Sequence, residues 1–207
     1  IRGQIDQPFG GLAAVLGRLS TEPHPLAVVP ARRLETDGRP WPVRAYFAIN
    51  ERLPVFRNGL FGRGMIALSA EERGRFDAFP ELIADDLFLD SQFTESEKAE
   101  AAGVVVTVAA PFTTRDLFRR LVRVRRGNAQ LRAEAAAARV DVTVRPADRW
   151  AWWRDVVRPD PRLLPSAVAY LALTVGAAAF ARLGSAERAG WGRGANTRRG
   201  TATGGTP

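Results

Sequence analysis

The sequence predicts an α/β fold, and three observations support that prediction. Short runs of β-branched residues, of which Val104 to Ala109 is the clearest, alternate with segments of helical periodicity. Glycine and proline clusters separate these segments. The chain has 207 residues, of which 46% are hydrophobic, and that is enough to bury a core of this kind. We therefore expect a mixed sheet flanked by helices.

The N-terminal elements are predicted from residue spacing. Apolar residues between Phe9 and Leu19 recur at helical spacing, and residues 26–29 have the pattern of a short buried strand. Residues 43–49 alternate well enough to predict a second strand. Three glycines within residues 57–64 precede a third strand over 65–68. These glycines indicate either a plain tight turn or a close approach of the backbone to a ligand.

Two adjacent carboxylates, Asp85 and Asp86, stand at the start of an apolar-periodic segment. The spacing of the following apolar residues predicts a loop leading into a short helix, with both acids in its first turn. Acids in this place commonly cap a helix and meet the positive end of its dipole. A pair of carboxylates also raises the affinity of one of them for a proton, which suits a general base. Both interpretations stay open on these residues alone. Upstream of the pair, Ser69 and Glu72 form a capping-box pattern for another short helix.

A long helix is predicted from Arg115 to about Ala138, with Thr114 as its N-cap and an interruption at Gly127-Asn128. On a helical projection its apolar side chains share one side and most arginines share the opposite side, with Arg120 near the boundary. The apolar residues are Leu117, Leu121, Val124 and Leu131, and the arginines are Arg115, Arg119, Arg123 and Arg126. Such a basic face is either solvated or occupied by an anion.

The C-terminal part combines tryptophans with a long uncharged segment. Residues 140–144 predict a strand, and Trp150, Trp152 and Trp153 follow. The uncharged segment 163–181 would span about 28 Å as a helix, which fits either a buried helix or one associated with a membrane. The composition of the last residues predicts a disordered tail over 186–207.

The charge balance favours an anionic partner. The net charge is +8, and Lys98 is the single lysine, so arginine supplies nearly all of the positive charge. Guanidinium groups suit phosphates and carboxylates, but nucleic acid, anionic lipid and a phosphorylated substrate all fit. The chain has no cysteine, which excludes disulfides and thiolate sites. Its single histidine, His24, lies between two prolines and is interpreted as a loop residue.

Four stretches, taken in their order, resemble the C-terminal half of a family 2 glycosyltransferase with a GT-A fold. They are Leu60 to Ser69, Phe79 to Leu89, Val104 to Pro111 and Arg119 to Arg123, within about residues 26–130. The resemblance implies a partial GT-A-like mixed sheet flanked by helices in residues 1–145, the acceptor-side half of the domain. A Trp-rich and apolar helical region, membrane-associated or not, follows in residues 146–185.

The resemblance also implies an activity, the transfer of a sugar from a nucleotide-sugar donor to an acceptor hydroxyl with inversion. In that family the second acid of the pair is the general base, which corresponds to Asp86 with Asp85 as its neighbour. The glycine-containing stretch helps to form the acceptor site and corresponds to Gly62, Arg63 and Gly64. The Gln-x-x-Arg-Trp motif matches best at residues 120–124, so that Arg120 and Arg123 would meet the donor diphosphate or the acceptor. Arginine and valine replace its Gln and Trp, which disfavours a processive polysaccharide synthase.

The family's Asp-x-Asp motif, which holds Mg²⁺ or Mn²⁺ on the donor phosphates, is largely missing, and Asp6 is its only candidate. We therefore expect a fragment that is active only with the donor half supplied. The expected partners are a nucleotide sugar and a glycan or lipid-linked acceptor of the cell envelope, in the cytoplasm or at the inner face of the cell membrane. Two alternatives stay open: a noncatalytic membrane-surface protein anchored by residues 150–181, and a nucleic-acid-binding module that uses the arginine face, which is disfavoured because few aromatic residues stand between the arginines.

Overall fold

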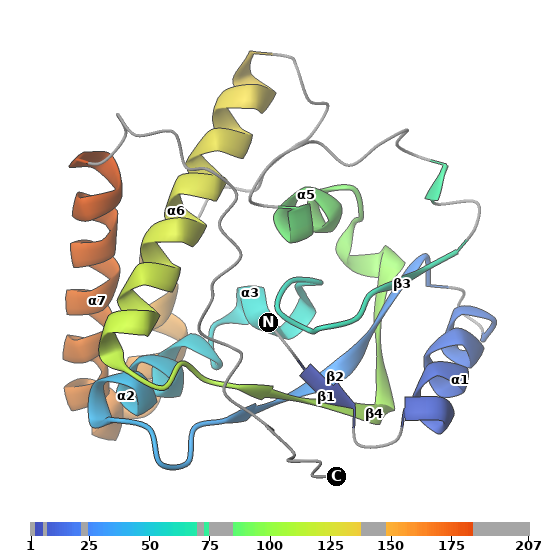
Figure 1. The fold of residues 1–207 in the computed structure, drawn as a ribbon, viewed down its shortest axis with the longest axis horizontal. Helices are drawn as coiled ribbons and strands as arrows, with labels where there is room; N and C mark the ends of the chain where they lie inside the picture. The colour runs from blue at the N-terminus through green and yellow to red at the C-terminus, as the bar shows by residue number, and fades with distance from the viewer. Residues whose placement is uncertain are drawn as a thin grey trace, which may run out of the picture.

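The computed structural model describes residues 3–5, 8–21, 25–69, 73–74, 85–137 and 148–183. These residues form a mixed sheet with helices packed around it (Figure 1), which confirms the predicted α/β class. The sheet has four strands in the order β1-β4-β2-β3. Their bounds are Gly3–Ile5 for β1, Ala27–Glu35 for β2, Ala67–Leu68 for β3 and Lys98–Ala109 for β4.

The parallel pair of β2 and β4 forms the centre of the sheet. It runs from Ala27 opposite Lys98 to Glu35 opposite Ala109, and its register shifts between Pro30 and Ala31. The short strands β1 and β3 add antiparallel edges to β4 and β2. The sequence located both central strands but predicted them too short, because the apolar runs cover only the buried part of each strand.

The predicted strand over residues 43–49 is wrong. This stretch lies within helix α2 (Trp41–Asn50), which has a proline in its first turn. Proline fixes φ near the helical value and lacks an N–H that would have no partner there, so the Pro-Trp-Pro sequence starts a helix instead of breaking one. Val43, Phe47 and Asn50 are buried at helical spacing, and this arrangement packs α2 against the rest of the core.

Three other helices largely follow the sequence prediction. Helix α1 covers Pro8–Leu19, and α5 covers Asp85–Ser91, so the two acids do lie in the first turn of a short helix. Helix α7 covers Leu164–Leu183 and follows a π-helical turn (Trp152–Val157) and a 3₁₀ turn (Pro161–Leu163). The sequence analysis did not predict the short helix α3 (Pro54–Asn58).

Helix α6 (Thr114–Ala136) differs from its prediction in three details. Its N-cap is Thr113, not Thr114, since the Thr113 hydroxyl accepts a hydrogen bond from the Asp116 amide at 3.0 Å. The helix continues through Gly127, which is buried. Val124 is 46% exposed, so it does not belong to the buried side, whereas Leu117 and Leu131 are fully buried.

Helices α2, α6 and α7 lie together on one side of the sheet (Figure 1). Their shared core contains Val43, Tyr46 and Phe47 of α2 and Leu117 of α6, with Tyr170 of α7 packed against it. Five predictions lie outside the described residues: the loop residue His24, the capping box at Glu72, the strand over 140–144, the tail over 186–207 and the metal ligand Asp6.

Candidate functional site

Helix α5 is held in place by the carboxylate of Asp90. This carboxylate accepts a hydrogen bond from the Leu60 amide at 2.8 Å and pairs with the Lys98 ammonium at 2.8 Å. The Lys98 side chain is 4% exposed and that of Asp90 13%, so the pair is buried. Leu60 precedes the glycine loop and Lys98 begins β4, and the three residues therefore fix α5 against both elements.

Asp86 lies one helical turn before Asp90 and on the same face of α5. Its carboxylate accepts a hydrogen bond from the Leu87 amide at 2.9 Å, and the residue is half-buried. It is also close enough to Arg120 of α6 to favour the charged form of that guanidinium. Asp85 is the first residue of α5. The structure thus brings together one acid of the pair and one of the two arginines that the sequence analysis grouped with it.

Arg120 is a largely buried guanidinium. Burial is the main cause that lowers its pKa from the ordinary value, and the like charge of Arg32 lowers it further, while Tyr46 and Asp86 oppose the shift. Among the described residues, none accepts a hydrogen bond from Arg120 or forms an ion pair with it at contact distance. The Arg120 side chain as a whole is half-buried, and its guanidinium is available to an anion.

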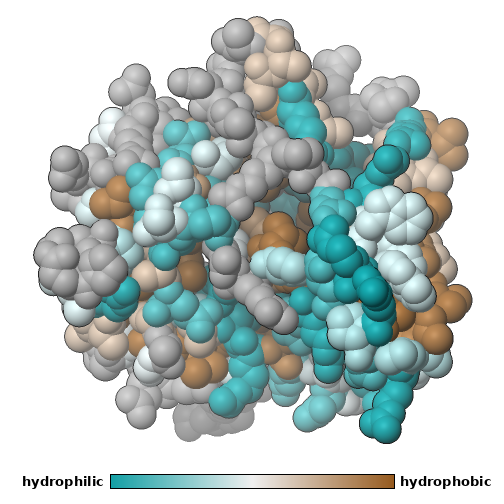
Figure 2. Space-filling model, turned by 180° about the vertical axis from the view of Figure 1, so that it is seen from behind, coloured by the Kyte–Doolittle hydropathy of each residue, from teal (hydrophilic) through white to brown (hydrophobic). Residues whose placement is uncertain are grey.

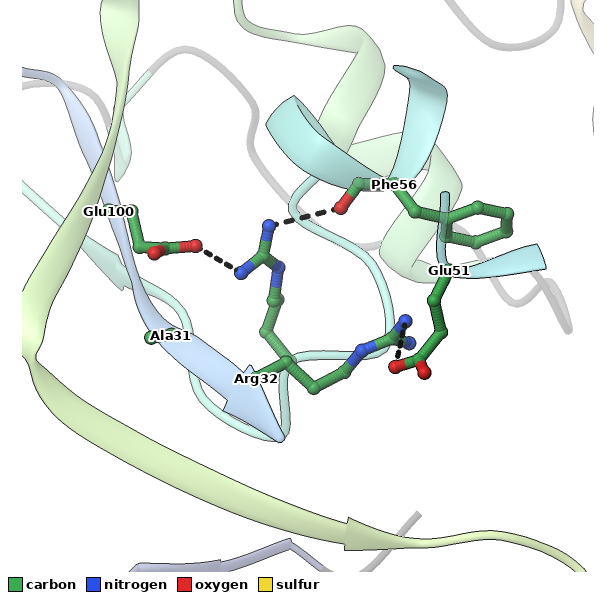
Figure 3. A pocket seen from close by; sticks show the side chains of 6 residues that line it. Ala31, Arg32, Glu51, Phe56 and Glu100 are labelled. Atoms are coloured by element: carbon green, nitrogen blue, oxygen red, sulfur yellow. Dashed lines mark hydrogen bonds and ion pairs between the residues drawn. The ribbon is translucent and has the colours of Figure 1, made fainter. Parts of the chain in front are cut away.

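A cavity of about 360 Å³ opens beside Arg32, lined by Ala31, Arg32, Glu51, Phe56, Arg63 and Glu100 (Figure 3). Nη2 of Arg32 lies 3.5 Å from Oε1 of Glu51, and its guanidinium lies over the Phe56 ring, 5.8 Å from the centroid. Burial raises the pKa of Glu51, and Arg32 offsets part of that rise. The cavity therefore offers an aromatic face together with charged groups of both signs.

Arg63, predicted to bind substrate, lines this cavity with a side chain that is only 6% exposed. Its guanidinium is paired with Glu100 and donates a hydrogen bond to the carbonyl oxygen of Phe56 at 3.1 Å (Figure 3). It also donates a hydrogen bond to the carbonyl oxygen of Pro30 at 3.3 Å. These contacts join β2, α3 and β4. The observed role of Arg63 is thus to hold the cavity wall together.

The two predicted glycines have backbone conformations that other residues rarely adopt. Gly62 has φ +70° and Gly64 has φ +79°. A Cβ on Gly62 would lie 3.4 Å from Nη1 of Arg32, so the loop also passes close to that side chain. Both glycines are therefore explained by a tight turn against a buried arginine.

Arg123, the other predicted arginine, is exposed on α6 together with Arg115 and Arg119. It is not among the charges that influence Arg120. Three of the four arginines on this face of α6 are therefore solvated, whereas Arg126 is half-buried and its Nε is buried without a hydrogen-bond partner.

Tyr46 is a site residue that the sequence analysis missed. It is 7% exposed, it stacks on Tyr170 with 5.3 Å between ring centroids, and burial raises its pKa above the ordinary value. Its charge interaction with Arg120 places it beside the buried guanidinium. The available signal was the helical spacing of Val43, Tyr46 and Asn50 after a proline, which the strand prediction overlooked.

Within the described ranges, no three His, Asp or Glu side chains gather as metal ligands. The described residues thus do not form a site for the Mg²⁺ or Mn²⁺ that the resemblance implies, and the proposed reaction contains no step at a metal ion.

Comparisons with protein-family models, with characterised proteins and with solved structures gave no match.

Proposed function

We propose that this chain supplies the acceptor side of a glycosyltransferase site. In the proposed reaction, Asp86 removes the proton from an acceptor hydroxyl as its oxygen attacks the anomeric carbon of a nucleotide sugar. The bond to the donor phosphate breaks, and the nucleoside diphosphate leaves with the bonding electron pair. A single displacement of this kind inverts the anomeric centre, and a positioned carboxylate is the group that it requires.

The observation that carries this proposal is the charge interaction between Asp86 and Arg120, a half-buried arginine without a hydrogen-bond or ion-pair partner among the described residues. Arginine forks bind phosphate groups bidentately, and a desolvated one binds them more strongly than a solvated one. In the proposed complex Arg120 holds a phosphate of the donor or an anionic group of the acceptor. Asp86 then lies within reach of the hydroxyl that attacks.

The catalytic part is tested, with the donor half of the enzyme supplied, by release of nucleoside diphosphate from a panel of nucleotide sugars mixed with glycan and lipid-linked acceptors. We expect Asp86→Asn to lower kcat by about a hundredfold or more, because the amide cannot take the proton, with little change in the KM for the donor. The matched control is Asp37→Asn, which changes an exposed acid in the turn after β2. Full activity of Asp86→Asn would overturn the assignment of the base.

The anion-binding part is tested separately, by calorimetry with inorganic pyrophosphate. We expect Arg120→Met to weaken binding roughly tenfold or more, since a charged hydrogen-bond donor is lost from a desolvated site. Arg132→Met, which alters an exposed arginine farther along α6, serves as the control. Equal weakening in both variants would show that general charge attraction accounts for the binding and that Arg120 forms no site.

A further inference from the structure

The outward side of α7 carries a continuous apolar stripe. Its members follow one another at intervals of four, four, three, four and four residues, which keeps them on one side of a helix. We call them the outer stripe: Leu164, Val168, Ala172, Val175, Ala179 and Leu183. All six are exposed, and the four largest have exposed fractions of 48% for Leu164, 67% for Val168, 62% for Val175 and 85% for Leu183.

Among the described residues, nothing covers this stripe. Figure 2 shows hydrophobic side chains gathered along the edge of the molecule where α7 lies, with hydrophilic side chains next to them. The most apolar window of the segment Pro161–Leu183 has a mean hydropathy of 1.8, and only 11% of that window is buried. A contiguous exposed surface of this kind marks contact with a membrane or with another protein.

The inner side of α7 is committed to the protein. Ala167 and Ala177 are buried, and Tyr170 stacks on Tyr46 of α2. At the edge of this side, Phe180 is 56% exposed and meets Phe118 of α6 edge to face at 5.9 Å. A helix surrounded by lipid on all sides would have to give up these contacts. The folded chain therefore presents one side of α7 to its surroundings, and a helix with one apolar side exposed lies along a membrane surface instead of crossing it.

Groups suited to the membrane interface stand at the N-terminal end of the stripe. Trp150 is 66% exposed and precedes the two turns that lead into α7, and Trp153, which is 43% exposed, lies in the first of these turns. Tryptophan prefers the depth of the lipid headgroups, where its ring is in an apolar region and its N–H reaches polar groups. A contact with a second copy of the chain would not require such residues.

Arginines at the N-terminal end of the outer stripe favour anionic lipids. Arg154 is paired with Asp148 and Asp155, both at less than 3 Å. Three further arginines in the turns before α7 are exposed, namely Arg149, Arg158 and Arg162. Basic groups beside an apolar surface attract anionic headgroups, and they repel a second copy of a chain whose net charge is +8.

We propose that the outer stripe of α7, with Trp150 and Trp153, seats this protein on an anionic lipid surface with α7 parallel to the membrane plane. This seating is independent of the proposed sugar transfer, because none of the residues that it uses lines the candidate site.

The binding is tested by flotation of the whole chain with phosphatidylcholine vesicles that either contain or lack phosphatidylglycerol. We expect wild-type protein to float with the anionic vesicles, and the Val168→Glu, Val175→Glu double variant to lose roughly tenfold or more of its partitioning. The matched control is Leu12→Glu, Leu16→Glu, which places the same two charges on exposed apolar positions of α1, 47% and 49% exposed. Equal loss in both double variants, or none in either, would overturn the proposal, and circular dichroism of each variant checks that it is folded.

The orientation of α7 is tested by measuring how deep three positions along the helix lie in the bilayer. The chain has no cysteine, so single cysteines at the exposed positions 168, 175 and 183 can each carry a fluorophore. Lipids brominated at different depths should quench all three labels at the same shallow level if α7 lies in the plane. Quenching of the label at 175 near the bilayer centre, with shallow labels at 168 and 183, would show a spanning helix and overturn the proposal. Absence of quenching at all three positions would overturn it as well, and the stripe would then belong to a protein interface.

Discussion

Two arginines of this protein, Arg63 and Arg120, should respond to the same substitution in opposite ways. Arg63 is engaged by Glu100 and by two backbone carbonyls, whereas Arg120 has no contact partner among the described residues. In Arg63→Met, the carbonyls of Pro30 and Phe56 each lose a hydrogen bond, at about 1 kcal/mol apiece. Loss of the ion pair adds about 0.5 kcal/mol, because the Glu100 side chain is 42% exposed and becomes hydrated. The expected destabilisation of Arg63→Met is therefore about 2 to 3 kcal/mol.

Arg120→Met should leave the free energy of unfolding unchanged or raise it by up to about 1 kcal/mol. The substitution removes a desolvated charge, as the lowered pKa of Arg120 indicates, and it keeps most of the apolar stem. The loss of attraction to Asp86 limits the gain. Functional groups commonly carry such a cost in stability, whereas structural groups do not.

Urea unfolding at neutral pH, followed by tryptophan fluorescence, measures both variants, and an unchanged m-value ensures that the midpoints can be compared. Pyrophosphate should raise the midpoint of the wild type and not that of Arg120→Met, since only a ligand of the native state stabilises it. A destabilisation of Arg120→Met as large as that of Arg63→Met would refute the reasoning. Arg120 would then be a structural residue, and the proposed anion site would lose its basis.

Three further predictions follow from the contacts. Burial raises the pKa of both tyrosines, Tyr46 and Tyr170, so in the folded protein tyrosinate absorbance should develop only at a pH above the ordinary pKa of 10. The free energy of unfolding should fall as the pH rises above 10, because the phenols of the unfolded chain ionise first. A tyrosinate titration of the folded protein with its midpoint at 10 would contradict this. Lys98→Met should lower the free energy of unfolding by about 3 kcal/mol, because it leaves the buried carboxylate of Asp90 without its partner. Adding Asp90→Asn should recover part of that loss in urea unfolding, since the amide oxygen still accepts the hydrogen bond from the Leu60 amide. No recovery would show that the unpaired charge is not the cause. Gly62→Ala should lower stability by about 1 kcal/mol, since φ there is +70°, and an unchanged thermal midpoint would argue against that backbone conformation.

The sequence predicted the elements whose patterns are local. The helix at Asp85 follows from acids placed before an apolar repeat, and the centre of β4 follows from its run of valines. Residues 43–49 were predicted incorrectly because a seven-residue apolar stretch fits both periodicities, and the prolines around Trp41 were taken as a break instead of a helix start. Local chemistry at the first turn decided that element.

The site was harder to predict because its contacts join distant parts of the chain. Arg63 and Glu100 are 37 residues apart, and nothing in either stretch indicates the other. A glycine loop that carries an arginine therefore resembled a substrate site, although the arginine is held by its own fold. Arg120 could be singled out from its place at the edge of the apolar side of α6, yet its lack of a partner became visible only in three dimensions.

Helix α2 connects the candidate site to the proposed membrane surface. Tyr46 interacts with the charge of Arg120 on one side and stacks on Tyr170 of α7 on the other. We expect this stacked pair to transmit displacement of α7 to the surroundings of Arg120, whereas the outer stripe faces away from both rings. Charges introduced on the outer stripe should therefore change membrane binding without changing pyrophosphate affinity, and Tyr170→Ala, which removes the stacked ring, should weaken pyrophosphate binding even in the absence of lipid. Equal affinity in wild type and Tyr170→Ala would show that the two regions share a helix without sharing an energetic connection.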